Sequence, residues 1–176
     1  MNIIKHPASK TGKAIGDFKL INEGNEIPGG LSGGKDSWTL LHVFIIWKKA
    51  PVNFGLYPVT VNPGLPGFIT AQSSEYLKKT LPDLNFIIEN TNISEVLNKH
   101  ITPGKSLCSF CSRLRRGVLY RIAIENNFNK IALGHHADDF IETLLLNQFF
   151  NGRIKAMTPL LSSDDGKKSH PSVILY

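Results

Sequence analysis

Short strand-like segments alternate with longer helical segments along most of this chain. The expected strands are apolar runs at 26–31, 52–61, 85–89 and 130–133. The expected helices, whose apolar residues recur every three or four positions, cover 12–18, 37–49, 71–80, 93–100, 112–126 and 137–150. This alternation predicts parallel βαβ units, and therefore an α/β fold with a doubly wound parallel sheet. In such a sheet the ligand crevice lies beyond the carboxyl ends of the strands.

The length and composition indicate a single domain over residues 1–176. Hydrophobic residues make up 41% of the chain and charged residues 19%, which is enough apolar material for a packed core and argues against disorder. The periodicity is lost after Asn151, and an irregular polar tail is expected from about residue 162. Pro28, Gly29 and Gly30 make the first expected strand a poor one, because proline removes a donor from the ladder.

The charge of the chain favours polyanionic partners. The formal net charge is +6, and nucleic acid is the commonest partner for such a balance. Between Glu95 and Glu125 there is no acidic residue, whereas six basic residues occur there: Lys99, Lys105, Arg113, Arg115, Arg116 and Arg121. A solvated helix face explains that run as well as a binding patch does. No apolar run approaches the roughly 20 residues of a membrane span, and no secretory signal is visible, so a cytoplasmic protein without a membrane partner is expected.

A glycine-rich hexapeptide, Ser32-Gly33-Gly34-Lys35-Asp36-Ser37, joins the first expected strand to the first long helix. Its glycines allow a tight turn whose N–H groups point at an anion, and the helix adds the positive end of its dipole. A Walker A loop is the obvious rival, but that motif needs Ser or Thr where this chain has Asp36. The segment therefore predicts a phosphate site of another kind.

The only two cysteines, Cys108 and Cys111, are separated by two residues and followed by Arg113, Arg115 and Arg116. This spacing suits half of a zinc site, a redox dithiol or part of an iron–sulfur site, and two buried small residues are the structural alternative. Arg113 and Arg116 share one helix face, with Arg115 about 160° round from Arg113. Those arginines are suited to neutralise phosphates, to bind an RNA backbone or to pair with acidic residues.

The segment Gly134-His135-His136-Ala137-Asp138-Asp139 follows a short apolar strand and opens a helix. A strand end places these side chains over the crevice. Asp138 or Asp139 could hold Mg²⁺ beside a triphosphate, although acidic residues in a first helical turn also act simply as caps.

Three segments together resemble the tRNA-cytidine(32) 2-sulfurtransferases, a family of PP-loop ATP pyrophosphatases. They are the phosphate loop at 31–37, the cysteine–arginine segment at 108–120 and the Gly-His-His segment at 132–139, and the likeness runs from about 16 to 168. The resemblance implies adenylation by ATP and Mg²⁺ of the C2 oxygen of a cytidine in the tRNA anticodon loop. Sulfur from a cysteine desulfurase or another donor, carried on a [4Fe-4S] cluster, then displaces AMP.

The resemblance also implies residue roles. It assigns ATP binding to seven residues besides Asp36, namely Ser32, Gly33, Gly34, Lys35, Ser37, Gly134 and His135. Cys108 and Cys111 would ligate the cluster, and Asp36 and Asp138 would act as catalytic carboxylates that hold magnesium. Arg115 would contact the activated nucleotide.

This chain departs from the family pattern in three places. Pro28-Gly29-Gly30 replaces an apolar, β-branched strand, and Asn62 stands where relatives carry an acidic residue. Family members also extend past residue 176 and carry a third cysteine ligand there, so the chain is expected to be truncated; a symmetric homodimer would pool four thiolates. The alternatives are another PP-loop ligase that adenylates tRNA, and an inactive relic that still binds RNA.

Overall fold

The computed structural model describes residues 4–49, 52–68, 70–100, 107–161 and 172–174. Six helices occur in this part of the chain: α1 (Lys5–Asp17), α2 (Lys35–Trp47), α3 (Thr70–Thr80), α4 (Ile93–His100), α5 (Leu107–Glu125) and α6 (Ala137–Asn151). Six strands accompany them: β1 (Asn25–Gly30), β2 (Phe54–Asn62), β3 (Ile87–Asn90), β4 (Ile131–Leu133), β5 (Leu160–Leu161) and β6 (Ser172–Ile174). None of the described helices is long and apolar enough to cross a bilayer.

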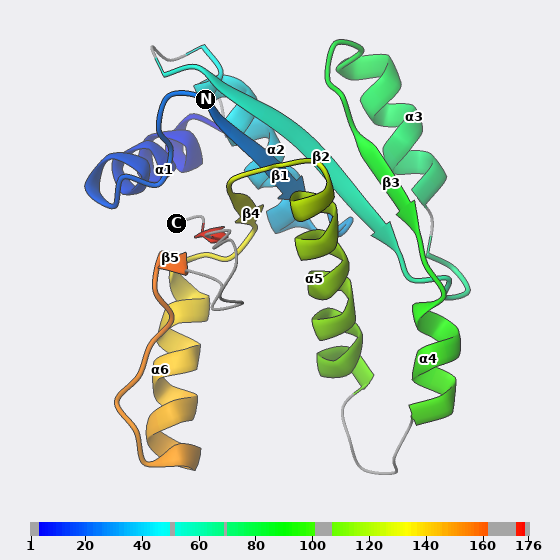
Figure 1. Cartoon of the computed structure of the whole chain (residues 1–176). Helices are drawn as coiled ribbons and strands as arrows, with labels where there is room; N and C mark the ends of the chain where they lie inside the picture. The colour runs from blue at the N-terminus through cyan, green and yellow to red at the C-terminus, as the bar shows by residue number, and fades with distance from the viewer. Residues whose placement is uncertain (1–3, 50–51, 69, 101–106, 162–171, 175–176) are drawn as a thin grey trace.

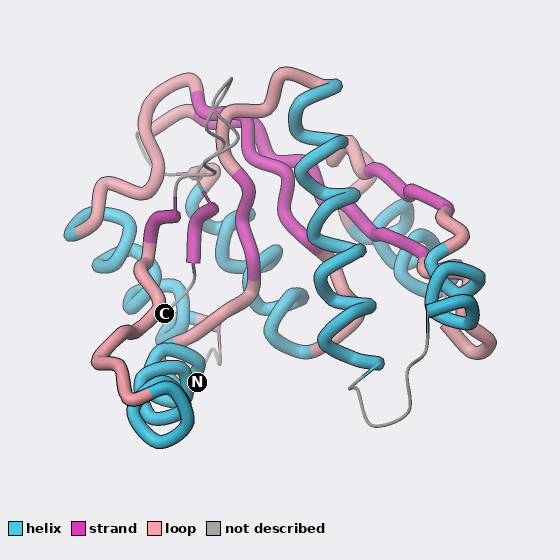
Figure 2. The backbone as a smooth tube through the Cα atoms, turned by 60° about the horizontal axis from the view of Figure 1, so that its bottom comes forward, coloured by secondary structure: helices cyan, strands magenta, loops and turns pink. Residues whose placement is uncertain are grey.

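The strands form one sheet in the order β3-β2-β1-β4-β6-β5 (Figures 1 and 2). All neighbouring pairs are parallel except β5 and β6 at the edge, which are antiparallel. Chain order runs outward from β1 to β3 on one side and then returns to β4 on the other. The carboxyl ends of β1 and β4 therefore flank the topological switch point, where open α/β sheets bind ligands.

Two apolar cores cover the two faces of the sheet, as the doubly wound prediction requires. One core joins buried residues of α1, α2 and α3 to the sheet, and the other joins those of α4 and α5. Strand β2 contributes side chains to both cores, because successive residues of a strand point to opposite faces of the sheet. Leu56 belongs to the first core, and Val59 and Val61 belong to the second.

Pro28 is accommodated in β1 although β1 is a central strand. All six residues of β1 are in register with β2, and Leu31 N donates to Val59 O of that strand at 2.8 Å. Glu26, two positions before Pro28, exchanges hydrogen bonds with Asn129 on the opposite side of β1. The backbone N–H and C=O groups of successive strand residues point to opposite sides, so those of Pro28 point to the same side as those of Glu26, toward β4. The N–H that proline lacks therefore removes one hydrogen bond on the β4 side and none on the β2 side.

Two sequence expectations are corrected by the structure. The helix expected to start at Ser112 begins at Leu107, so both cysteines lie on α5. The irregular tail expected from about 162 contains strand β6, which pairs with β4 in a parallel register from Ile131–Ser172 to Leu133–Ile174. The rest of that tail, and Lys105 of the basic run, lie outside the described residues.

Packing of α1 on α2 gives a test of the fold. The indole Nε1 of Trp47 donates to Ala8 O at 3.0 Å, and a Cβ added to Gly12 would lie 1.8 Å from that indole ring. We expect Gly12→Ala to lower the free energy of unfolding by about 1–3 kcal/mol despite alanine's better helix propensity. Urea denaturation measures the change. Gly16→Ala on the same helix, where an added Cβ meets nothing within 4 Å, is the control and should be neutral or stabilising. Equal stabilisation by both substitutions would contradict this packing.

Candidate active site

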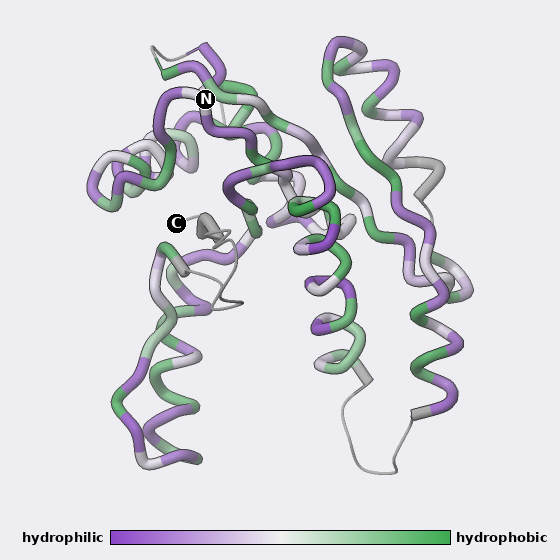
Figure 3. Tube along the Cα trace, viewed as in Figure 1, coloured by the Kyte–Doolittle hydropathy of each residue, from purple (hydrophilic) through white to green (hydrophobic). Residues whose placement is uncertain are grey.

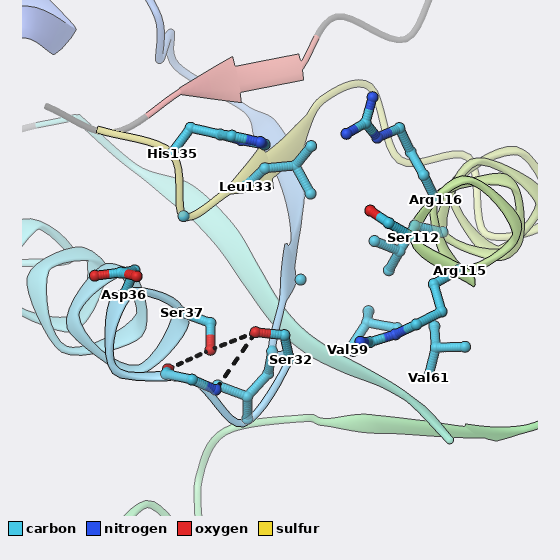
Figure 4. A pocket seen from close by; sticks show the side chains of 15 residues that line it. Ser32, Asp36, Ser37, Val59, Val61, Ser112, Arg115, Arg116, Leu133 and His135 are labelled. Carbon is cyan, nitrogen blue, oxygen red and sulfur yellow. Dashed lines mark hydrogen bonds between the residues drawn. The ribbon is translucent and has the colours of Figure 1, made fainter. Parts of the chain in front are cut away.

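A cavity of about 250 Å³ lies at the carboxyl ends of β1, β2 and β4, with α5 forming its far wall (Figure 4). The residues that line it come from four separate segments of the chain. They are Gly30, Leu31, Ser32, Gly34, Asp36, Ser37, Val59, Val61, Ser112, Arg115, Arg116, Leu119, Leu133, Gly134 and His135. One side of the cavity is therefore polar and glycine-rich, the floor is apolar, and the opposite side is basic.

The loop after β1 folds around the hydroxyl of Ser32. Ser32 Oγ lies 3.2 Å from Ser37 Oγ and 3.4 Å from Gly34 N, and Ser37 Oγ donates to Gly34 O at 2.8 Å. Gly33 has a φ of +88°, a conformation that favours glycine. Gly34 caps α2 without a side-chain hydrogen bond, so the first N–H groups of this helix keep their capacity for an anion.

The loop after β4 lies directly against the start of α2. A Cβ added to Gly134 would lie 3.0 Å from the carbonyl carbon of Asp36 and from Ser37 N, which is tighter than nearly all real Cβ contacts. Glycine at this position therefore lets the two loops touch. The close approach brings the Gly-His-His segment to the phosphate loop.

Three carboxylates surround His136 at the beginning of α6. Its Nε2 lies 4.0 Å from Asp36 Oδ1, and its Nδ1 lies 3.9 Å from Asp138 Oδ2 and 3.6 Å from Asp139 Oδ2. Asp139 also accepts a hydrogen bond from His136 N at 2.7 Å, so it caps the helix. Asp138 is 80% exposed and makes no such bond in the described part of the chain, which leaves its carboxylate available to a cation.

The donors fit a magnesium ion that also binds phosphate. No group of three metal-ligating side chains converges among the described residues. Mg²⁺ bound with nucleotide phosphates needs only one or two protein carboxylates. Asp36 and Asp138, on either side of His136, satisfy that requirement.

His135 lines the cavity. Burial lowers the pKa of its imidazole, Asp139 opposes that shift, and Arg116 reinforces it. Its Nδ1 is buried and has no hydrogen-bond partner among the described residues.

Arg115 and Arg116 make the α5 side of the cavity basic. Ser112 and Leu119 line the same side, because residues three or four apart lie on one face of a helix. Figure 4 shows Arg115 reaching from α5 toward the side of the cavity that holds Val59 and Ser32. Its guanidinium also lies 5.4 Å from the centre of the Phe68 ring. Burial lowers the pKa of Arg115. Arg113 is exposed and lies outside the cavity.

Cys108 and Cys111 occupy the first turns of α5 and do not line the cavity. Both are free thiols; Cys108 is exposed, and Cys111 is half-buried against the second core. Their spacing of three places both on one helix face. Two thiolates match the cysteine ligation of an iron–sulfur cluster only in part, because a [4Fe-4S] cluster usually takes four.

Seven of the predicted nucleotide-site and catalytic residues line the cavity: Ser32, Gly34, Asp36, Ser37, Arg115, Gly134 and His135. Gly33, Lys35 and Asp138 lie beside it without lining it. The sequence prediction assigned no specific role to His136, Ser112 or Arg116, although it placed His136 over the crevice and counted Arg116 among the arginines suited to phosphates. The last two follow from the helical spacing to Arg115, once α5 is known to face the cavity. Asn62 also lies outside the cavity, and its amide bridges Gly64 N and Asn90 Oδ1 at 3.0 Å each.

This site and fold define a nucleotide-binding PP-loop protein. The model of the PP-loop domain family matches residues 6–171, and the chain belongs to that family. A tRNA-cytidine(32) 2-sulfurtransferase from Syntrophotalea carbinolica is 49% identical over 169 residues, which cover 94% of this chain and 64% of that protein. The enzyme of the same name from Paraburkholderia xenovorans is 45% identical over 166 residues, covering 94% and 49%. The chain thus spans about half to two thirds of these relatives.

Solved structures give the same assignment of fold. The U34-tRNA thiolase NcsA from Methanococcus maripaludis, solved with its [4Fe-4S] cluster, superposes with a TM-score of 0.72 at 27% identity. That match covers 97% of this chain and 58% of NcsA. An NH3-dependent NAD synthetase from Campylobacter jejuni in complex with nitrate shares the fold alone, with a TM-score of 0.53 at 17% identity over 85% of this chain and 62% of that one.

Proposed function

We propose that this chain carries the ATP-dependent thiolation of cytidine 32 in the tRNA anticodon loop, producing 2-thiocytidine in the cytoplasm. The observation that carries the proposal is the meeting of three segments at one cavity: the phosphate loop, the Gly134–His135 turn and the Arg115–Arg116 face of α5. Similarity to the cytidine(32) sulfurtransferases supports the choice of reaction and substrate.

The residues of the site suit the adenylation step. The phosphates of ATP bind the loop of Ser32 and Gly34 and the N-terminus of α2. Asp36 and Asp138 would hold Mg²⁺, which would neutralise phosphate charge. The O2 atom of the cytidine attacks the α-phosphorus, the bond to the β-phosphate oxygen breaks, and pyrophosphate leaves. Arg115 stabilises the negative charge that develops at the α-phosphate.

The second step replaces oxygen by sulfur at the same carbon. The persulfide sulfur of a cysteine desulfurase or another donor is first released as sulfide by a dithiol reductant, which becomes a disulfide. The sulfide then adds to C2, and the C2–O bond breaks with AMP as the leaving group. Cys108 and Cys111 supply two thiolate ligands for an iron–sulfur cluster, which delivers the sulfide when bound. Because these cysteines lie on the same helix as Arg115, α5 links the sulfur-delivering end to the adenylation cavity.

Nucleoside analysis tests the choice of base. We expect the protein, reconstituted anaerobically with iron and sulfide and given ATP, Mg²⁺ and tRNA, to produce 2-thiocytidine at position 32, measured by mass spectrometry of digested tRNA. A product of 2-thiouridine at position 34 would instead assign the specificity of the NcsA type and would overturn the cytidine proposal.

The exposed arginines of α5 are expected to bind the tRNA backbone. Arg113 and Arg116 form no ion pair within the described part of the chain, whereas Arg121 on the same helix pairs with Glu89 at 2.5 Å and Glu125 at 3.2 Å. We expect Arg113→Ala with Arg116→Ala to weaken tRNA binding and to reduce the slope of log K against log salt by roughly 1 to 2.

Filter binding over a range of salt concentrations measures that slope. Arg121→Ala is the matched control, because its charge is already neutralised by two carboxylates, and its slope should stay close to that of the unmodified protein. An unchanged slope in the double variant would place the tRNA contacts elsewhere.

A further inference from the structure

Arg115 reaches the cavity without the support of an ion pair. In the described part of the chain only Arg121 and His136 lie within ion-pair distance of a carboxylate. An arginine side chain has many rotamers, so a guanidinium keeps one position only if another group holds it there. Arg115 does contact the ring of Phe68, whose centre lies 5.4 Å from its Cζ, within the range of a cation–π interaction.

Phe68 lies in the loop that joins β2 to α3, and backbone hydrogen bonds fix the course of this loop. At its start, Ser94 N of α4 donates to Pro63 O at 2.8 Å. Toward its end, Phe68 N donates to Leu65 O at 3.2 Å and closes a turn that contains Gly67, whose φ is +80°. The backbone that carries the Phe68 ring is therefore defined by its own contacts.

Packing in an apolar core does not account for Phe68. The residue is half-buried and belongs to neither of the two cores. Figure 3 shows that the second half of β2 is largely apolar, and Val59 and Val61 of this segment line the cavity. Phe68 follows this strand, and its ring meets the guanidinium that α5 extends toward Val59 and Val61 (Figure 4). The contact with Arg115 explains an aromatic residue at this position.

An aromatic partner also suits a guanidinium that must bind phosphate. A carboxylate would neutralise the charge of Arg115 and occupy some of its N–H donors. A ring face accepts the cation without taking up those donors, so all five stay available to phosphate oxygens.

We propose that Phe68 is a positioning residue for adenylation, whose ring holds the guanidinium of Arg115 at the cavity with its donors free for the α-phosphate. Phe68 does not itself line the cavity, so it acts through Arg115. The inference rests on the proposed function, because it concerns the step in which Arg115 stabilises charge at that phosphate.

The kinetics of tRNA-dependent AMP formation test this role. We expect Phe68→Leu, which keeps an apolar side chain and removes the ring, to lower kcat by about 3- to 30-fold. The KM for ATP should stay within about two-fold, because the contact of Arg115 with phosphate strengthens in the transition state. Phe68→Tyr retains the ring and should keep kcat within about two-fold of the unmodified protein. Phe18→Leu, at an exposed phenylalanine outside the cavity, is the control and should leave both constants unchanged.

A double-mutant cycle separates the positioning of Arg115 from a general effect on the structure. In an Arg115→Ala background, Phe68→Leu should change kcat by less than about two-fold, because the guanidinium that the ring holds is already absent. An equal loss in both backgrounds would show that Phe68 acts independently of Arg115 and would overturn the inference.

Nuclear magnetic resonance observes the contact without any turnover. In protein with isotopically labelled arginine, the Nε–H signal of Arg115 is identified by its absence from Arg115→Lys. We expect this signal to move in Phe68→Leu, which removes the ring current, and to stay near its original position in Phe68→Tyr.

Two results would overturn this inference alone: an unmoved signal in Phe68→Leu, or AMP formation by the unmodified protein that Phe68→Leu leaves unchanged. Absence of AMP formation by the unmodified protein would instead overturn the proposed function, and this inference with it.

Discussion

Replacing Asp36 with Asn is expected to reduce tRNA-dependent formation of AMP from ATP by at least about 100-fold, while tRNA binding persists. Asp36 lies in the first turn of α2, lines the cavity and is 4.0 Å from His136, which also approaches Asp138. Asparagine keeps the size of the side chain and removes the charge that holds Mg²⁺ against the phosphates. Quantifying labelled AMP and tRNA affinity on the same preparation measures both effects.

Asp17→Asn is the matched control for Asp36→Asn. Asp17 is an exposed carboxylate at the end of α1, outside the cavity, so its neutralisation should leave AMP formation unchanged. Full turnover by Asp36→Asn would show that this carboxylate does not hold the metal. Loss of tRNA binding in the same variant would show that its effect is not confined to ATP chemistry.

Replacing Cys108 and Cys111 with Ser is expected to remove bound iron and abolish thiolation while leaving tRNA-dependent AMP formation. The two thiols lie in the first turns of α5, whereas the phosphate loop and the Gly134 turn form the opposite side of the cavity. Adenylation depends on the second group of residues, so the two half-reactions should separate. Iron analysis and nucleoside mass spectrometry measure the loss, and AMP release measures what is retained.

Single substitutions distinguish ligation from packing at these cysteines. Cys111 is half-buried against the second core, so Cys111→Ala keeps most of the apolar contact and removes only the ligand. We expect it to lose iron as Cys111→Ser does. Iron content equal to that of the unmodified protein in either variant would contradict the cluster assignment.

The sequence predicts the sheet and the site well where local chemistry determines structure. The alternation of strands and helices gives the doubly wound sheet, and the two loops at its switch point follow from their glycines and flanking elements. The first strand forms despite Pro28 because the hydrogen bonds that join β1 to β2 do not use the backbone N–H position of that residue.

Other features depend on long-range packing and could not be predicted in the same way. Strand β6 forms because β4 offers it a parallel partner some 40 residues earlier in the chain. The place of Arg115 and Arg116 beside the cavity, with Arg113 outside, depends on how α5 rotates against the sheet, which helical spacing alone leaves open. The position of His136 between Asp36 and Asp138 depends on contact between two loops roughly 100 residues apart.

The most direct test of the central claim is the nucleotide product formed from ATP labelled at the α-phosphate. The protein is first reconstituted anaerobically with iron and sulfide and then supplied with Mg²⁺ and bulk tRNA. Cleavage between the α- and β-phosphates predicts labelled AMP that appears only when tRNA is present. Labelled ADP, or no product from protein shown to be folded, would contradict the assignment of this site as an adenylating PP-loop.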